Sequence, residues 1–164
     1  MPAQNTFDPL ESINDVLAMF ESQIKSKGLK LQKTMVEEGE PSELPEFLVG
    51  DEQRMKQVIC NLVKNAIKFT TKGLILLTAS YDRPQGQIFI KVSDTGKGIA
   101  AEEISTLCQK FGKLLRTAEM NCEGVGLGLM ISKALIEANG GELRIESEGV
   151  GRGSSFTFSM KMHD

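Results

Sequence analysis

The order in which two kinds of hydrophobic pattern follow one another limits the possible folds of this chain more than any other feature. Apolar residues spaced three and four apart predict amphipathic helices over residues 7–28, 51–69 and from 126 to just before 139. Alternating apolar residues predict strands over 29–36, 73–81, 87–93, 142–147 and 154–162. Helices and strands do not alternate strictly, which disfavours a doubly wound sheet. We therefore predict an α+β fold, a two-layer α/β sandwich with about three helices on one face of a mixed, mostly antiparallel sheet.

The size and composition of the chain are those of one globular domain. Its 164 residues predict a single domain over 1–164, with a core of about 7–162. A net charge of −3 without a basic stripe excludes nucleic acid as an expected partner. Because no apolar run approaches the roughly 18 residues that span a bilayer, we expect a cytoplasmic domain without membrane contact; any anchor would lie outside this chain. The three cysteines lack metal-ligand spacing, which favours a reducing compartment.

The predicted helix over 51–69 has two different faces. At about 100° per residue, Asn61, Asn65 and Lys68 lie within an arc of roughly 60°, and Arg54 and Gln57 extend the same polar stripe backward. An apolar flank is formed by Met55, Val58, Ile59, Leu62 and Ala66. By itself such a stripe is commonly a solvated helix face. Asparagine oxygens can also bind Mg²⁺, and a lysine can meet a phosphate.

Most of the sixteen glycines fall in the second half of the chain, and seven of them form the clusters DTGKG at 94–98, GVGLG at 124–128 and GRG at 151–153. A single cluster would indicate only a turn. GVGLGL is not a dinucleotide fingerprint, because Leu129 stands in place of the third glycine and no strand directly precedes it. A P-loop and the HRD and DFG motifs of eukaryotic protein kinases are absent. Phosphate binding would need another arrangement.

Five short motifs in order resemble the catalytic ATP-binding domain of sensor histidine kinases. They are Asn61-x-x-x-Asn65-Ala66-x-Lys68-Phe69-Thr70, Asp94-x-Gly96-x-Gly98-Ile99, Phe111, Gly124-x-Gly126-Leu127-Gly128-Leu129 and Gly151-x-Gly153-Ser154-x-Phe156. The superfamily also contains gyrase, the heat-shock 90 chaperones and MutL. The resemblance covers about residues 7–162. It implies a Bergerat-type ATP-binding fold with a mobile ATP lid at about 112–125, and ATP and Mg²⁺ as ligands.

The resemblance also implies roles for single residues. Asp94 would accept a hydrogen bond from the adenine 6-amino group, which favours ATP over GTP, although an aspartate before glycine is also a common turn former. Asn65 would bind Mg²⁺ with the help of Asn61, and Lys68 would meet phosphate; these three form the expected catalytic set. The implied ATP-binding residues are Asn61, Asn65, Lys68, Phe69, Asp94, Gly96, Gly98, Ile99, Phe111, Arg116, Gly124, Val125, Gly126, Leu127, Gly128, Leu129 and Ser154.

Several of these assignments have a second interpretation. Gly96 and Gly98 would let the backbone pass close to the base, on which Ile99 would pack. Arg116 and Lys113 are candidates for the γ-phosphate, but Arg116 also suits a plain surface position. Residues 124–128 would form the hinge and phosphate-binding end of the lid, and Gly126 would open a helix whose amides suit an anion. The Ser154 hydroxyl could touch the adenine side or serve strand-end packing.

Two departures from the family pattern bear on function. Many histidine kinases have a second phenylalanine after the one that corresponds to Phe111, but this chain does not. In lacking it, the chain resembles the lids of hybrid-type kinases. The single histidine, His163, lies one residue from the C-terminus and is not a credible phosphoacceptor. In the family the acceptor belongs to a separate helical dimerisation domain, which is absent here. We therefore expect an isolated monomer that does not autophosphorylate, whose partners are such a domain and a downstream receiver domain or response regulator.

Asn61 bears on the reaction itself. Hydrolysing clamps of the superfamily carry a glutamate four residues before the metal asparagine, where it can activate water. Asn61 cannot accept a proton at neutral pH. The expected function is therefore transfer of the γ-phosphoryl group of Mg²⁺-ATP to a histidine on a separate domain, in two-component signal transduction. The alternatives are a nucleotide-binding regulatory module without turnover and an ATP-hydrolysing clamp.

Overall fold

The computed structural model describes residues 4–35, 42–104 and 126–164, with the backbone alone at 126 and 127. Along the chain the elements are β1 (Asn5–Phe7), α1 (Pro9–Ser26), β2 (Lys30–Met35), β3 (Leu48–Gly50), α2 (Glu52–Phe69), β4 (Leu74–Asp82), β5 (Gln87–Asp94), α5 (Gly126–Ala138), β6 (Leu143–Glu146) and β7 (Ser154–Lys161). The predicted helices and the strands of the main sheet are therefore present, close to their expected bounds.

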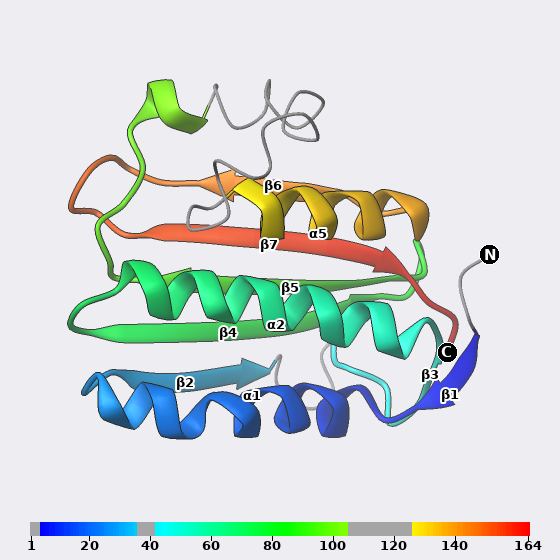
Figure 1. Ribbon diagram of the computed structural model, residues 1–164. Helices are drawn as coiled ribbons and strands as arrows, with labels where there is room; N and C mark the ends of the chain where they lie inside the picture. The colour runs from blue at the N-terminus through cyan, green and yellow to red at the C-terminus, as the bar shows by residue number, and fades with distance from the viewer. Residues whose placement is uncertain (1–3, 36–41, 105–125) are drawn as a thin grey trace.

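The main sheet has five strands in the order β2-β4-β5-β7-β6. Strands β2 and β4 are parallel, and the other three pairs are antiparallel. Helices α1, α2 and α5 lie side by side over one face of this sheet (Figure 1), and α2 contacts both of the other helices. The predicted two-layer α+β fold with a mixed, mostly antiparallel sheet is confirmed.

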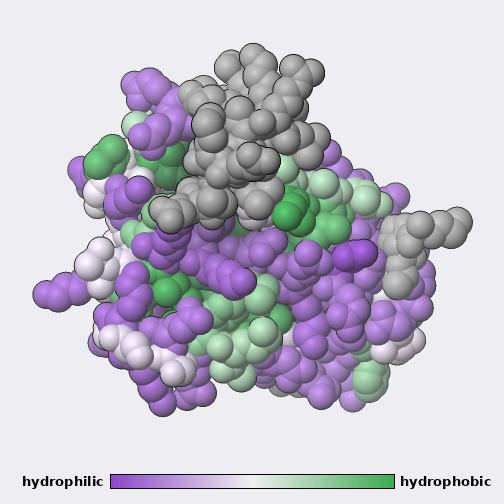
Figure 2. All heavy atoms as spheres, viewed as in Figure 1, coloured by the Kyte–Doolittle hydropathy of each residue, from purple (hydrophilic) through white to green (hydrophobic). Residues whose placement is uncertain are grey.

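The core lies between the two layers. Strand β4 alternates strictly, so that Ile75, Leu77, Ala79 and Tyr81 are buried while the residues between them are partly exposed. Figure 2 shows that the surface on the helical side is mostly hydrophilic outside the grey atoms, with hydrophobic residues in separate patches. In the described part of the chain, no helix combines the length and apolarity required to cross a membrane.

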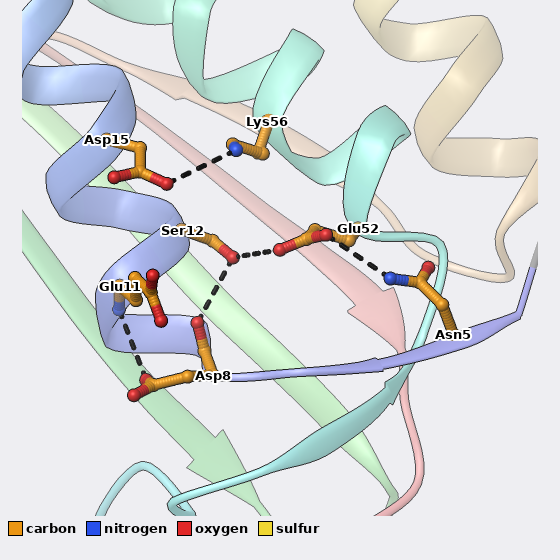
Figure 3. Close-up of polar contacts among 7 residues, drawn as sticks. All are labelled: Asn5, Asp8, Glu11, Ser12, Asp15, Glu52 and Lys56. Atoms are coloured by element: carbon orange, nitrogen blue, oxygen red, sulfur yellow. Dashed lines mark hydrogen bonds and ion pairs between the residues drawn. The ribbon is translucent and has the colours of Figure 1, made fainter.

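Local sequence explains where α1 begins and how it is fastened. The Asp8 side chain accepts hydrogen bonds from the backbone N–H groups of Leu10 and Glu11, at 2.9 and 3.1 Å, and so caps the helix. The buried hydroxyl of Ser12 lies 2.6 Å from Glu52 Oε2 and 3.1 Å from the Asp8 carbonyl oxygen (Figure 3). Asn5 Nδ2 donates to the other Glu52 oxygen at 3.2 Å. These contacts join β1, α1 and the first turn of α2.

Two short strands were not predicted. Strands β1 and β3 pair antiparallel in a separate sheet, and Val49 of β3 also forms a bridge with His163 near the C-terminus. The prediction that the first helix starts at Phe7 was wrong, because Phe7 belongs to β1 and pairs with Leu48. Strands of three residues are too short to show a period in the sequence, and their pairing depends on residues distant in the chain.

Candidate functional site

The polar stripe of α2 supplies the first part of the candidate site. Asp51 caps the helix by accepting a hydrogen bond from the Arg54 backbone N–H at 3.1 Å, and Arg54 Nη1 donates to Gln57 Oε1 at 3.1 Å. The opposite face is buried through Met55, Val58, Ile59, Leu62, Val63, Ala66 and Ile67. Core packing therefore fixes the rotation of the helix and directs the stripe away from the core, toward α5.

Two asparagines on this stripe have different surroundings. Asn61 Nδ2 donates to the hydroxyl of Ser132 on α5 at 3.1 Å. One turn later, the Nδ2 atom of Asn65 is buried and has no hydrogen-bond partner among the described residues. A buried amide without a partner is costly and is uncommon unless it serves another purpose. The side-chain N–H group of Asn65 can therefore donate a hydrogen bond to a group from outside the chain.

The end of α2 meets the DTGKG loop. The Phe69 carbonyl oxygen accepts a hydrogen bond from the Lys97 N–H at 3.1 Å. The Phe69 ring has two cations over it, with Lys97 Nζ at 4.6 Å and Lys68 Nζ at 5.6 Å from its centroid. Gly96 packs so closely here that a Cβ atom would overlap the Phe69 carbonyl oxygen. The structure therefore brings the predicted residues Lys68, Phe69 and Gly96 together, and adds Lys97, which the sequence analysis did not name.

Asp94 stands at the end of β5, directly opposite Ser154 at the start of β7. Its Oδ1 atom accepts from the Gly96 N–H at 2.9 Å, and its Oδ2 atom accepts from the Ser154 hydroxyl at 2.8 Å. Both carboxylate oxygens are therefore oriented from within the chain. Each oxygen keeps further acceptor capacity, because a carboxylate offers about four lone-pair sites.

The first and third glycine clusters pack against each other. The Gly151 N–H donates to the Lys97 carbonyl at 2.6 Å, and the Gly153 N–H donates to the Gly96 carbonyl at 3.2 Å. Gly98 and Gly153 both have positive φ, at 70° and 73°. In this structure, therefore, glycine is needed at these positions for contact between backbones.

Ser147 joins the same two loops. Its hydroxyl oxygen accepts from the Ile99 N–H at 3.0 Å and from the Gly149 N–H at 3.2 Å, and the hydroxyl donates to the Gly153 carbonyl at 2.6 Å. Ile99 is buried beside this junction. The sequence analysis did not name Ser147, because a serine after a strand carries no local signal of such a role.

Some of the remaining predicted site residues lie in α5, and the others lie outside the described residues. Helix α5 begins at Gly126 and contains Leu127, Gly128 and Leu129. Leu129 is fully buried in the core, whereas a Cβ atom at Gly128 would meet nothing within 4 Å among the described residues. Phe111, Lys113, Arg116, Gly124 and Val125, and with them the expected lid at 112–125, lie outside the described residues.

In outline, a polar helix face, a carboxylate at a strand end and two interlocked glycine loops occupy one end of the sheet. Comparison with known proteins agrees with this arrangement. The family described as histidine kinase-, DNA gyrase B-, and HSP90-like ATPase matches residues 50–164. The chain therefore belongs to this ATPase family.

Within this family, the relatives are sensor kinases. The chain is 35% identical over 159 residues to the sensor protein GacS of Pseudomonas syringae pv. syringae, covering 95% of this chain and 17% of GacS. It is 37% identical over 157 residues to the sensor histidine kinase RcsC of Escherichia coli K12, covering 96% of this chain and 16% of RcsC. To the adaptive-response sensory kinase SasA of Synechococcus elongatus it is 32% identical over 162 residues, covering 99% of this chain and 39% of SasA. The chain thus spans less than half the length of each of these relatives.

Solved structures show the same fold. The crystal structure of full-length ShkA in complex with AMPPNP is similar with a TM-score of 0.81 at 28% identity, covering 99% of this chain and 32% of ShkA. A nucleotide-free catalytic domain of the histidine kinase ThkA is similar with a TM-score of 0.75 at 26% identity, covering 96% of this chain and 97% of that domain.

Proposed function

We propose that the chain binds Mg²⁺-ATP and positions its γ-phosphoryl group for transfer to a histidine on a separate dimerisation domain, in two-component signal transduction. The observation that carries this proposal is the meeting of the α2 stripe with the Asp94 loop through the Phe69 carbonyl and the Lys97 N–H. At one end of the sheet, the Asp94 carboxylate is thereby suited to bind a nucleobase. Beside it, the asparagine amides and Lys68 of α2 are suited to bind a metal-bound triphosphate.

Recognition of adenine rests on Asp94. Its carboxylate can only accept hydrogen bonds, and the adenine 6-amino group can donate one, whereas guanine presents a carbonyl at that position. The bonds from Gly96 and Ser154 hold the carboxylate in one orientation before any ligand arrives. Nucleotide binding therefore costs no entropy for ordering the Asp94 side chain. Because the carboxylate only accepts hydrogen bonds, the site should prefer ATP to GTP.

The residues present fit a magnesium ion that arrives with phosphate. No group of three or more His, Cys, Asp or Glu side chains within the described ranges could hold a metal alone. Mg²⁺ needs only one or two protein oxygens when substrate phosphates and waters supply the others. The side-chain oxygen of Asn65 would hold it, and the Asn65 N–H group, which lacks a described partner, would donate to a phosphate oxygen; Asn61 lies one turn away. Bound there, Mg²⁺ would neutralise charge on the phosphate oxygens.

Transfer is favoured over hydrolysis because Asn61 offers no base for water. Its amide nitrogen is occupied by Ser132, and an amide does not take up a proton at neutral pH. An acceptor imidazole is already a good nucleophile, so the residues of this chain need only bind, orient and shield the phosphoryl group. Lys68, at the last turn of α2, adds positive charge.

The acceptor histidine is not His163. Ser154, which contacts Asp94, begins β7, and His163 follows the other end of this eight-residue strand, where it pairs with Val49. A strand of this length spans roughly 25 Å. The partners are therefore a histidine-bearing dimerisation domain and, downstream, a receiver domain or response regulator, in the cytoplasm; nucleic acid and membrane are not partners of this domain.

The test mixes the chain with radiolabelled ATP, Mg²⁺ and a dimerisation domain from its own full-length protein. We expect acid-labile, base-stable phosphoprotein on that domain. Asn65→Ala should remove the Mg²⁺-dependent part of ATP affinity, while Lys64→Ala, which changes an exposed neighbour on the same helix, should not. Nucleotide binding without transfer would instead indicate a regulatory module, and steady phosphate release by the chain alone would indicate a hydrolysing clamp.

A further inference from the structure

Ser132 is one of few buried polar residues in the described part of the chain. The others are Ser12, Asp51, Thr70 and Ser159. Ser132 has no exposed surface and lies on α5, 71 positions from Asn61, whose amide nitrogen donates to its hydroxyl at 3.1 Å. A buried hydroxyl in a helix interface is retained at a cost unless its hydrogen bonds are made. Its partner Asn61 belongs to the proposed phosphate site.

We propose that Ser132 is a positioning residue that holds the Asn61 amide in one orientation, with its carbonyl oxygen turned to the metal and phosphate. The inference rests on the proposed function, since only then does the orientation of Asn61 matter to chemistry. An amide is planar, with its donor and acceptor on opposite branches. With Nδ2 donating to Ser132, as in this structure, Oδ1 lies on the branch that does not face the serine. The flipped form, which would present an N–H to a cation, would require the Ser132 hydroxyl to turn from acceptor to donor.

The same bond joins two parts of the site. Asn61 lies one turn before Asn65 on α2, and Ser132 lies six positions after Gly126, where α5 begins. Six residues correspond to about 9 Å of helix. The bond thereby links the helix that begins with Gly126 and Gly128 to the polar stripe of α2. The alternative is a packing role, in which Ser132 only fills space between α2 and α5.

The first measurement reads the bond directly in the chain without nucleotide. In wild type, the side-chain amide protons of Asn61 should show a shifted NMR resonance and slowed exchange with water. Ser132→Ala, and Ser132→Cys, which keeps the shape with a slightly larger atom but accepts hydrogen bonds poorly, should both abolish these features. An unchanged Asn61 resonance in both variants would overturn the inference.

The second measurement compares affinity for AMPPNP with Mg²⁺ and with EDTA, by calorimetry. Ser132→Ala and Ser132→Cys should reduce the Mg²⁺-dependent gain in affinity about 3- to 10-fold, the effect of one hydrogen bond, while affinity in EDTA stays within about twofold. The matched control is Ser159→Ala: this serine is also buried and accepts a hydrogen bond, from the Glu142 N–H at 3.1 Å, and its loss should leave the Mg²⁺-dependent gain unchanged.

A double-mutant cycle distinguishes positioning from packing. In an Asn61→Ala background, adding Ser132→Ala should cause no further loss of the Mg²⁺-dependent gain. Two results would overturn the role of Ser132 and leave the proposed function standing. One is an equal loss of the Mg²⁺-dependent gain in affinity in both backgrounds. The other is an unchanged gain in the single Ser132 variants while wild type responds to Mg²⁺. Absence of any Mg²⁺-dependent binding in wild type would instead overturn the proposed function, and the role of Ser132 with it.

Discussion

Replacing Asp94 by asparagine separates recognition of the base from stability of the fold. The carboxylate makes two hydrogen bonds inside the chain, from the Gly96 N–H at 2.9 Å and from the Ser154 hydroxyl at 2.8 Å. An asparagine can preserve both contacts. Its carbonyl oxygen faces the Gly96 N–H, and its amide nitrogen donates to the Ser154 oxygen, because a hydroxyl can rotate from donor to acceptor. The opposite amide orientation would set two N–H groups against each other.

The magnitudes follow from this geometry. Since no buried group loses its partner, Asp94→Asn should change the free energy of unfolding by less than about 1 kcal/mol. The adenine amino group, however, would lose a charged acceptor. Hydrogen bonds to charged groups contribute about 1.5–3 kcal/mol, which corresponds to roughly 10- to 150-fold weaker binding. Ser154→Ala keeps the charge and loses only one orienting bond, so we expect a loss of about 2- to 10-fold.

The assay is calorimetric titration with ADP and AMPPNP, with thermal unfolding of each variant as the measure of stability. ADP is informative because it presents the base without the γ-phosphate, so that effects on Lys68 and the metal site are kept apart. An Asp94→Asn variant that unfolds like wild type and binds ADP within twofold of wild type would refute the assignment of Asp94 to the base.

Three further predictions concern backbone and pH. Gly153→Ala should destabilise by at least about 2 kcal/mol in urea unfolding, because its Cβ would overlap the Asp94 carbonyl oxygen at a φ of 73°; a wild-type midpoint would contradict this. Gly128→Ala, which meets nothing within 4 Å among the described residues, should raise the free energy of unfolding by up to about 1 kcal/mol yet weaken AMPPNP binding, so unchanged affinity would argue against a nucleotide contact there. Burial raises the pKa of Tyr81, whose hydroxyl donates to the Met162 carbonyl at 3.3 Å. Because the pKa is higher in the folded state, the neutral form of Tyr81 stabilises the fold. This stabilisation is complete below the unfolded tyrosine pKa of about 10 and is lost as pH rises through the folded pKa. Tyr81→Phe should remove that alkaline loss in unfolding curves measured from pH 8 to 11, and an identical pH dependence in the variant would exclude it.

Local sequence was informative where one element carries the whole signal. The two faces of α2 could be predicted because helical geometry places Asn61, Asn65 and Lys68 together whatever the rest of the chain does. The strands predicted over 73–81 and 87–93 correspond to β4 and β5 with bounds that differ by one residue, and the polar and glycine-rich segments marked the ends of elements.

Other features could not be read locally. The pairing of β1 with β3 joins residues more than 40 positions apart, and three-residue strands have no period to detect. The packing of Gly98 and Gly153 against backbone, the junction at Ser147, the cations over Phe69 and the bond from Asn61 to Ser132 all depend on which loops and helices become neighbours.

By itself, then, the sequence determined the type and order of the main helices and strands, the polar stripe of α2, and the motifs that place the chain in its family. Those features depend on spacing along one helix or strand. The tertiary structure alone decided how Asp94 is oriented, which asparagine amide is held and which lacks a described partner, because each of these is set by atoms that packing brings from distant parts of the chain.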